Sequence, residues 1–181
     1  MKFVVQLPST EPNSSGDKGA DGHHSNTAFF VVELSFRKEL PHSTYTFLTL
    51  VESNLYNDGA ALLSTREGGG LKIGSHQSNN VITLERKQKP LGLTDASSLS
   101  FAETSTSGEP LPCGEYTFGF GHRGPELSLF ISDEDVDEKN SETDCFAHVI
   151  RGQENLRKIQ SLLLESGGSL EILSAKHLRV D

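Results

Sequence analysis

The sequence of 181 residues has little of several features that often define a protein class. It contains two cysteines and no tryptophan. Two cysteines, Cys113 and Cys145, exclude a disulfide-rich scaffold and a four-cysteine zinc site, and they leave room for one disulfide bond. The first apolar run is too short for the core of a signal peptide, and no later run reaches the roughly 20 residues of a membrane-spanning helix.

Basic residues are also scarce, because 16 Lys and Arg face 25 Asp and Glu and the net charge is -9. Nucleic acids and anionic membranes attract basic surfaces, so we expect neither as a partner. The length fits a single domain, residues 1–181, with a core that needs no metal or disulfide. We expect a soluble monomer, cytoplasmic by default. The lumen of the secretory pathway is the alternative if the chain is a domain of a longer precursor.

Residues 28–56 are the stretch around which the rest of the chain is organised. Residues 29–36 are aromatic and β-branched, which is typical of a buried strand. The following Leu40-Pro41 is a helix start, because proline fixes φ and the first turn of a helix needs no donor there. One apolar stripe then predicts a helix through Thr44, Phe47, Leu48, Val51 and Leu55.

Short strands dominate the rest of the chain. We predict them at residues 1–7, 60–63, 71–73, 81–84, 116–120, 127–131, 145–150 and 170–180, with a second helix after Gly152. Between them we predict a flexible loop at 8–27, a long loop at 85–112 and an acidic loop at 132–144. Many short strands around two helices indicate a mainly β fold, an antiparallel barrel or sandwich with helical covers. The predicted core includes Phe30, Val32, Leu34, Phe47, Val51, Phe146, Val149 and Ile159.

Two motifs resemble ligand sites but lack the required context. Residues 119–124 spell GxGxxG, yet Pro125 and a strand follow where a dinucleotide site needs a helix, so we interpret the motif as a turn. Asp133, Asp135 and Asp137 alternate like calcium ligands, but Glu138 stands where a calcium loop needs glycine. These aspartates are weak calcium candidates, and a solvated acidic loop is the favoured interpretation. We expect no metal and no cofactor.

The order of the segments resembles a known family. VVELSF, then LPHSTYTFLTLV, then residues 116–131, and finally CFAHVIRGQENLRKIQ follow one another as in the cyclophilin-type peptidyl-prolyl isomerase domain. The resemblance spans nearly the whole chain and depends on this order, since no single motif is exact. It looks closest to divergent algal and protist members, through EYTFGF and DCFAHV. It implies a cyclophilin-like closed antiparallel β-barrel with two covering α-helices.

The resemblance also predicts a peptide groove and what has changed in it. The family's arginine, which polarises the prolyl amide, aligns with Ser64, and Arg66 is the candidate substitute two residues later. The family's groove glutamine aligns with Ile73, and the covering tryptophan loop aligns with the acidic loop. The predicted groove residues are Ser64, Ile73, Phe120, Gly121, His122 and Phe130.

We therefore predict a module that binds a proline-containing peptide or a protein partner without isomerase activity. An atypical but active isomerase that uses Arg66 is the alternative. We also hypothesise that Cys113 and Cys145 pair in an oxidising compartment, because their segments can be neighbours in such a barrel and pairing requires Cα atoms within roughly 7 Å.

Overall fold

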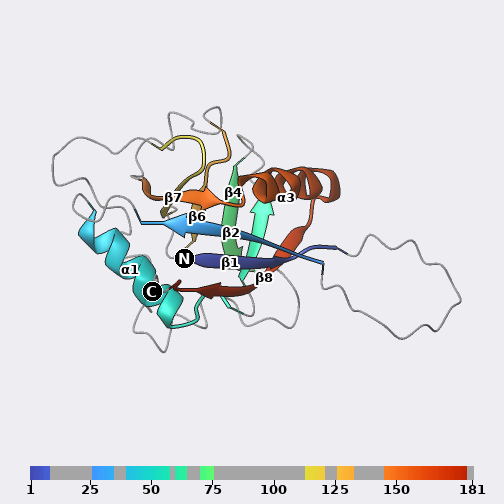
Figure 1. Ribbon diagram of the computed structural model, residues 1–181. Helices are drawn as coiled ribbons and strands as arrows, with labels where there is room; N and C mark the ends of the chain where they lie inside the picture. The colour runs from blue at the N-terminus through green and yellow to red at the C-terminus, as the bar shows by residue number, and fades with distance from the viewer. Residues whose placement is uncertain are drawn as a thin grey trace, which may run out of the picture.

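The computed structural model describes residues 1–8, 26–34, 40–57, 60–64, 70–75, 113–120, 126–132 and 145–178. Over these residues the strands form a closed barrel in the order β1-β2-β7-β5-β6-β4-β3-β8, and every neighbouring pair is antiparallel. Figure 1 shows the barrel between two helices, α1 and α3. The elements are β1 Lys2–Gln6, β2 Thr27–Glu33, α1 Pro41–Glu52, β3 Ala60–Ser64, β4 Leu71–Ser75, β5 Thr117–Phe120, β6 Leu127–Leu129, β7 Cys145–Arg151, α3 Gln153–Ser166 and β8 Ser169–Lys176.

This architecture confirms the predicted fold class, a mainly β chain closed into an antiparallel barrel with two helices. The last strand is shorter than predicted, because β8 ends at Lys176. The predicted strand at 81–84 and the predicted loop at 85–112 lie outside the described residues, as do residues 9–25 and 133–144 of the other two loops.

Aromatic rings fill the centre of the barrel. The Phe3 ring stacks on Phe30 with centroids 4.9 Å apart, and the Phe47 ring lies 5.3 Å from Phe146. All four side chains are fully buried. Of the predicted core residues, Phe30, Val32, Phe47, Val51, Phe146, Val149 and Ile159 are buried, and Leu34 packs against the core while partly exposed.

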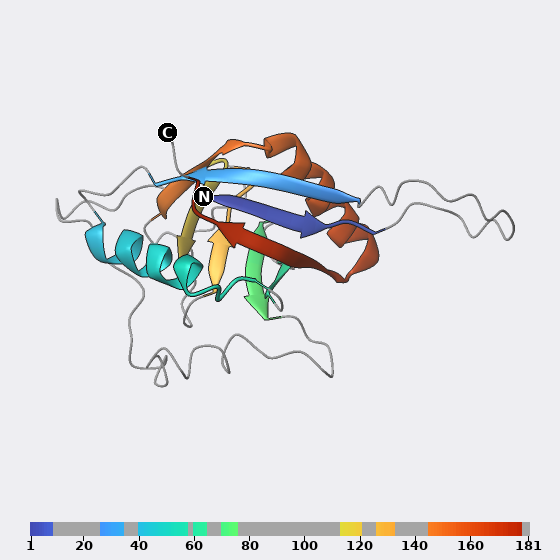
Figure 2. The ribbon, with the colours of Figure 1, turned by 60° about the horizontal axis from the view of Figure 1, so that its bottom comes forward.

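The two helices cover opposite ends of the barrel, as Figures 1 and 2 show. Helix α1 starts at Pro41 as predicted and packs beside β8, whereas α3 packs against β2 and β3. Gly152 precedes α3 with a φ of 86°, a left-handed conformation that suits glycine. No helix in the described part of the chain is long and apolar enough to cross a membrane.

Candidate functional site

The alternation of side chains along a strand shows which residues of β4 and its neighbours point outward. Successive side chains of a strand point to opposite faces, and residues directly opposite on paired strands share a face. On β4, Leu71 and Ile73 are buried in the core, so Lys72 between them points outward. Lys72 stands opposite Leu63 of β3 and Ser128 of β6, so these side chains also point outward.

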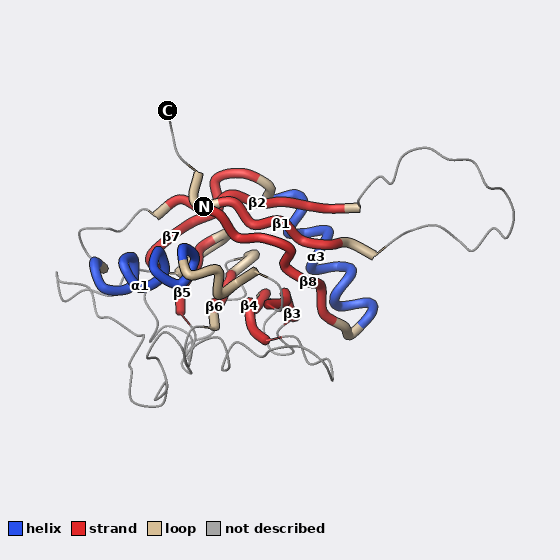
Figure 3. Tube along the Cα trace, turned by 90° about the horizontal axis from the view of Figure 1, so that it is seen from below, coloured by secondary structure: helices blue, strands red, loops and turns tan. Residues whose placement is uncertain are grey.

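The same face continues across β5 and β7. Ser128 stands opposite Gly119, and Gly119 stands opposite Cys145. In Figure 3, β5, β6, β4 and β3 follow one another from left to right, in agreement with this pairing. One row therefore crosses five neighbouring strands, and we call it the outer row: Leu63, Lys72, Ser128, Gly119 and Cys145.

An ion pair occupies one end of the outer row. The Lys72 ammonium contacts the carboxylate of Glu126, which lies just before β6. A Cβ added to Gly74 would lie 3.3 Å from this carboxylate and 3.4 Å from a methyl group of Leu63, so both side chains extend over Gly74. The positive charge of Lys72 is thus matched by a fixed negative charge, although a partly exposed pair of this kind contributes only about 0–1 kcal/mol to stability.

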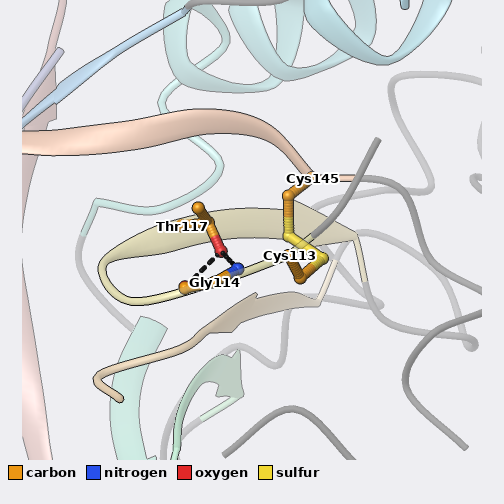
Figure 4. The surroundings of a disulfide bond; sticks show 4 residues. All are labelled: Cys113, Gly114, Thr117 and Cys145. Atoms are coloured by element: carbon orange, nitrogen blue, oxygen red, sulfur yellow. Dashed lines mark hydrogen bonds between the residues drawn. A yellow bond between two sulfur atoms is a disulfide. The ribbon is translucent and has the colours of Figure 1, made fainter. Parts of the chain in front are cut away.

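A disulfide bond occupies the other end. The Sγ atoms of Cys113 and Cys145 are 2.07 Å apart and their Cα atoms 5.2 Å apart, which confirms the pairing hypothesised from the sequence (Figure 4). Cys113 leads into a tight turn before β5. In this turn the Gly114 N–H donates to Thr117 Oγ1 over 2.8 Å, and the Thr117 hydroxyl donates to the Gly114 carbonyl over 2.6 Å.

Phe130, which the resemblance places in the groove, lies beside this turn. Its N–H donates to the carbonyl of Thr117 over 3.0 Å. The side chain is 3% exposed but does not belong to the continuous core of the barrel. Phe130 is therefore close to the outer row and covered, so its ring is not open to a ligand in this state.

The other predicted groove residues that the structure describes face inward. Ile73 and Phe120 belong to the core, and the Phe120 ring lies 5.0 Å from Phe146. Ser64 stands opposite the buried Leu71 and so shares the inner face of the wall. Their side chains do not form the outer surface of a groove. Arg66, Gly121, His122, Asp133, Asp135 and Asp137 lie outside the described residues.

The outward positions of the β3–β4 hairpin were missed in the sequence alignment. Leu63 and Lys72 each precede by one residue the positions aligned with the family's arginine and glutamine, Ser64 and Ile73. The alternation of Leu71, Lys72 and Ile73, apolar then charged then apolar, is the signal that identifies Lys72 as outward.

A hollow lies where β2, β7 and the end of β8 meet. Its walls include Val31, Leu34, Ile150 and Leu178, with Glu33 and His177 as polar members. The Glu33 carboxylate lies 3.5 Å from Nε2 of His148. The volume of about 190 Å³ is below the ~300–1,000 Å³ of pockets for drug-sized ligands, so the hollow fits a small chemical group at most.

No family model matches this chain, and no curated protein matches its sequence. The molecule is thus defined by its architecture, a closed β-barrel domain with two helices and an outer row between an ion pair and a disulfide.

Proposed function

We propose that this chain is a divergent cyclophilin-like domain that binds a proline-containing peptide or protein segment and does not catalyse prolyl isomerisation. The closed barrel, the proline-started helix and the order of the elements support the family resemblance. The observation that carries the non-catalytic part is the outer surface of the β3–β4 hairpin, where Leu63 is apolar and Lys72 is bound to Glu126.

Catalysis of prolyl isomerisation requires electrostatic stabilisation of the twisted amide. The uncatalysed barrier is about 18–20 kcal/mol, and a catalyst must stabilise the twisted amide more than the planar one. Donors or cations fixed beside the amide supply this stabilisation when they are not already neutralised. Ser64 is uncharged and on the inner face, and the charge of Lys72 is offset by a carboxylate. Neither residue can therefore stabilise a twisted amide.

Binding without catalysis requires only a surface that can contact the peptide. The described strands form a closed barrel without a free edge among them, so a peptide cannot bind these strands by adding another strand. It must bind through side-chain contacts across a face. Within the outer row, Leu63, Lys72 and Ser128 are partly exposed and can make such contacts, whereas Gly119 and Cys145 are buried in this state.

The test is an NMR titration of the uniformly ¹⁵N-labelled chain with a library of proline-containing peptides. We expect shift changes at the amides of Leu63, Lys72, Gly119 and Ser128, and none at Phe3 in the strand pair β1–β2. Ser128→Arg should abolish binding by placing bulk on the outer row. Ser161→Arg makes the same chemical change on the exposed surface of α3 and should leave binding intact. Shift changes that avoid the outer row, or equal losses in both variants, would refute this placement of the site.

A further inference from the structure

We propose that the Cys113–Cys145 disulfide is a redox-sensitive control of the outer row. In the oxidised chain the bond fixes the turn that leads to Thr117, whose carbonyl accepts the Phe130 N–H, and its reduction opens this turn while the barrel stays closed. The consequence for peptide binding rests on the proposed function, whereas the opening itself does not.

The position of the bond supports a regulatory role. Cys145 belongs to the outer row and stands opposite Gly119. Its partner Cys113 is partly exposed, whereas Cys145 is fully buried. An external thiol therefore meets Cys113 first, and the bond lies within reach of a reductant without unfolding of the barrel.

The turn couples the disulfide to Phe130 through one residue, Thr117. Its N–H and its hydroxyl both bond to Gly114, the residue directly after Cys113, and its carbonyl accepts the N–H of Phe130. The segment tied down by the disulfide is thus the segment that holds the backbone of Phe130. A change in its position therefore loosens the hold on the Phe130 backbone.

Backbone strain makes the turn dependent on its anchors. Tyr116 has a φ of 59°, a left-handed conformation that costs a residue with a Cβ about 1–2 kcal/mol. Besides the disulfide, the turn is held from α3 by Arg157, whose guanidinium lies 2.9 Å from the Glu115 carboxylate and 5.6 Å from the centre of the Tyr116 ring. Both partners of that ion pair are well exposed, so the pair is a weak anchor.

The ladder between β5 and β7 does not depend on the disulfide. The Val149 N–H donates to the Tyr116 carbonyl over 2.8 Å, and Phe118 stands opposite Ala147. These contacts keep the strands paired after reduction and hold the Tyr116 end of the turn on β7, so the opening is limited to the Cys113 end of the turn and to Phe130.

The chemistry is thiol–disulfide exchange with a dithiol reductant. One thiolate of the reductant attacks Sγ of Cys113, forms a mixed disulfide and releases the Cys145 thiolate, which takes a proton from solvent. The second thiol of the reductant then attacks the mixed disulfide and releases Cys113. Two protein thiols form, and the reductant leaves as its own disulfide, so two electrons and two protons are transferred in total.

The test is amide hydrogen exchange on the full chain, oxidised and after treatment with dithiothreitol, together with the Cys113→Ser/Cys145→Ser double variant with and without the same treatment. We expect exchange at Phe130 and Thr117 to accelerate on reduction at least about tenfold more than exchange at Phe3 and Phe30 in β1 and β2, whose acceleration follows only the loss of global stability. The double variant should show the fast exchange with and without reductant. Unchanged exchange at Phe130, or equal acceleration at all four amides, would overturn the proposal. The wild-type comparison alone decides the question if the double variant does not fold.

Peptide titration of the same two redox states separates this inference from the proposed function. Local opening with tighter binding in the reduced state supports both. Local opening without binding in either state leaves the redox control standing and refutes the binding function. Binding that is equal in both states, without local opening, refutes the redox control alone.

Discussion

The side-chain amide of Asn155 on α3 donates a hydrogen bond to the backbone carbonyl of Phe29 on β2, 2.8 Å away and 126 residues earlier in the chain. The same carbonyl lies directly beside Gly152, where an added Cβ would contact it and the backbone of Phe30. The start of α3 is therefore fixed on β2 at a distance that only glycine permits.

Replacing Gly152 with alanine should be strongly destabilising. The left-handed φ of 86° costs about 1–2 kcal/mol for alanine, and the collision with the Phe29 carbonyl adds strain, so we expect a total loss of about 2–4 kcal/mol. Gly167→Ala is the matched control, since its φ is 62° but nothing lies within 4 Å of the new Cβ. It should lose only about 1–2 kcal/mol. Equal losses in urea unfolding would show that the close approach to β2 is not a constraint.

Thr44 offers a substitution that should not destabilise. It is 4% exposed, and within the described part of the chain its Oγ1 has no hydrogen-bond partner. Thr44→Val removes an unsatisfied buried hydroxyl, so we expect unfolding stability to be unchanged or raised by about 1–2 kcal/mol. Thr49→Val on the exposed side of α1 should stay within about 0.5 kcal/mol of wild type. A clear loss of stability for Thr44→Val would mean that this hydroxyl is satisfied.

Tyr56 should make the fold sensitive to high pH. Complete burial raises the pKa of its hydroxyl well above the ordinary value of 10.0. The folded state therefore keeps the proton at a pH where the unfolded state releases it, and stability from this residue falls as pH rises above about 10, by about 1.4 kcal/mol per pH unit. Tyr56→Phe lacks this dependence. We expect the stability difference between wild type and variant to shift toward the variant in urea unfolding between about pH 9 and 11. A difference that stays constant with pH would contradict ionisation of Tyr56 on unfolding.

The disulfide should contribute substantially to stability. It closes a segment with a sequence separation of 32, for which chain entropy gives about 3–4 kcal/mol. Urea unfolding with and without dithiothreitol measures the contribution, and the Cys113→Ser/Cys145→Ser variant should not respond to the reductant. A wild-type chain whose stability is the same in both conditions would show that the bond does not form in solution.

The sequence predicted the elements of the fold well because their signals are local. Pro41 begins α1, and the stripe through Phe47 and Val51 sets the buried side of the helix. The strand order required pairing between distant segments, such as β3 with β8, which no local pattern contains. The closed antiparallel barrel with two helices was predicted and is confirmed, whereas the order of its strands was not predicted.

The candidate site was harder to predict because a shift of one residue in the alignment of a strand exchanges its inward and outward side chains. Aligning Ile73 with the groove glutamine placed an inward residue in an outward role, and the alignment of Ser64 has the same shift. The alternation of Phe118, Gly119 and Phe120 marks Phe120 as inward in the same way. The pairing of Lys72 with Glu126 crosses between β4 and the start of β6, so it follows only from the strand order.

The central claim, binding without catalysis, is tested most directly by measuring cis/trans exchange of a proline peptide in the presence of the chain. An active prolyl isomerase serves as the positive control for the assay. We predict that the wild-type chain binds the peptide, seen as shift changes on the outer row, and leaves the exchange rate at its uncatalysed value. Arg66→Ala and Lys72→Ala should show the same rate. Wild-type acceleration that is lost in either variant would contradict the account and identify that cation as catalytic.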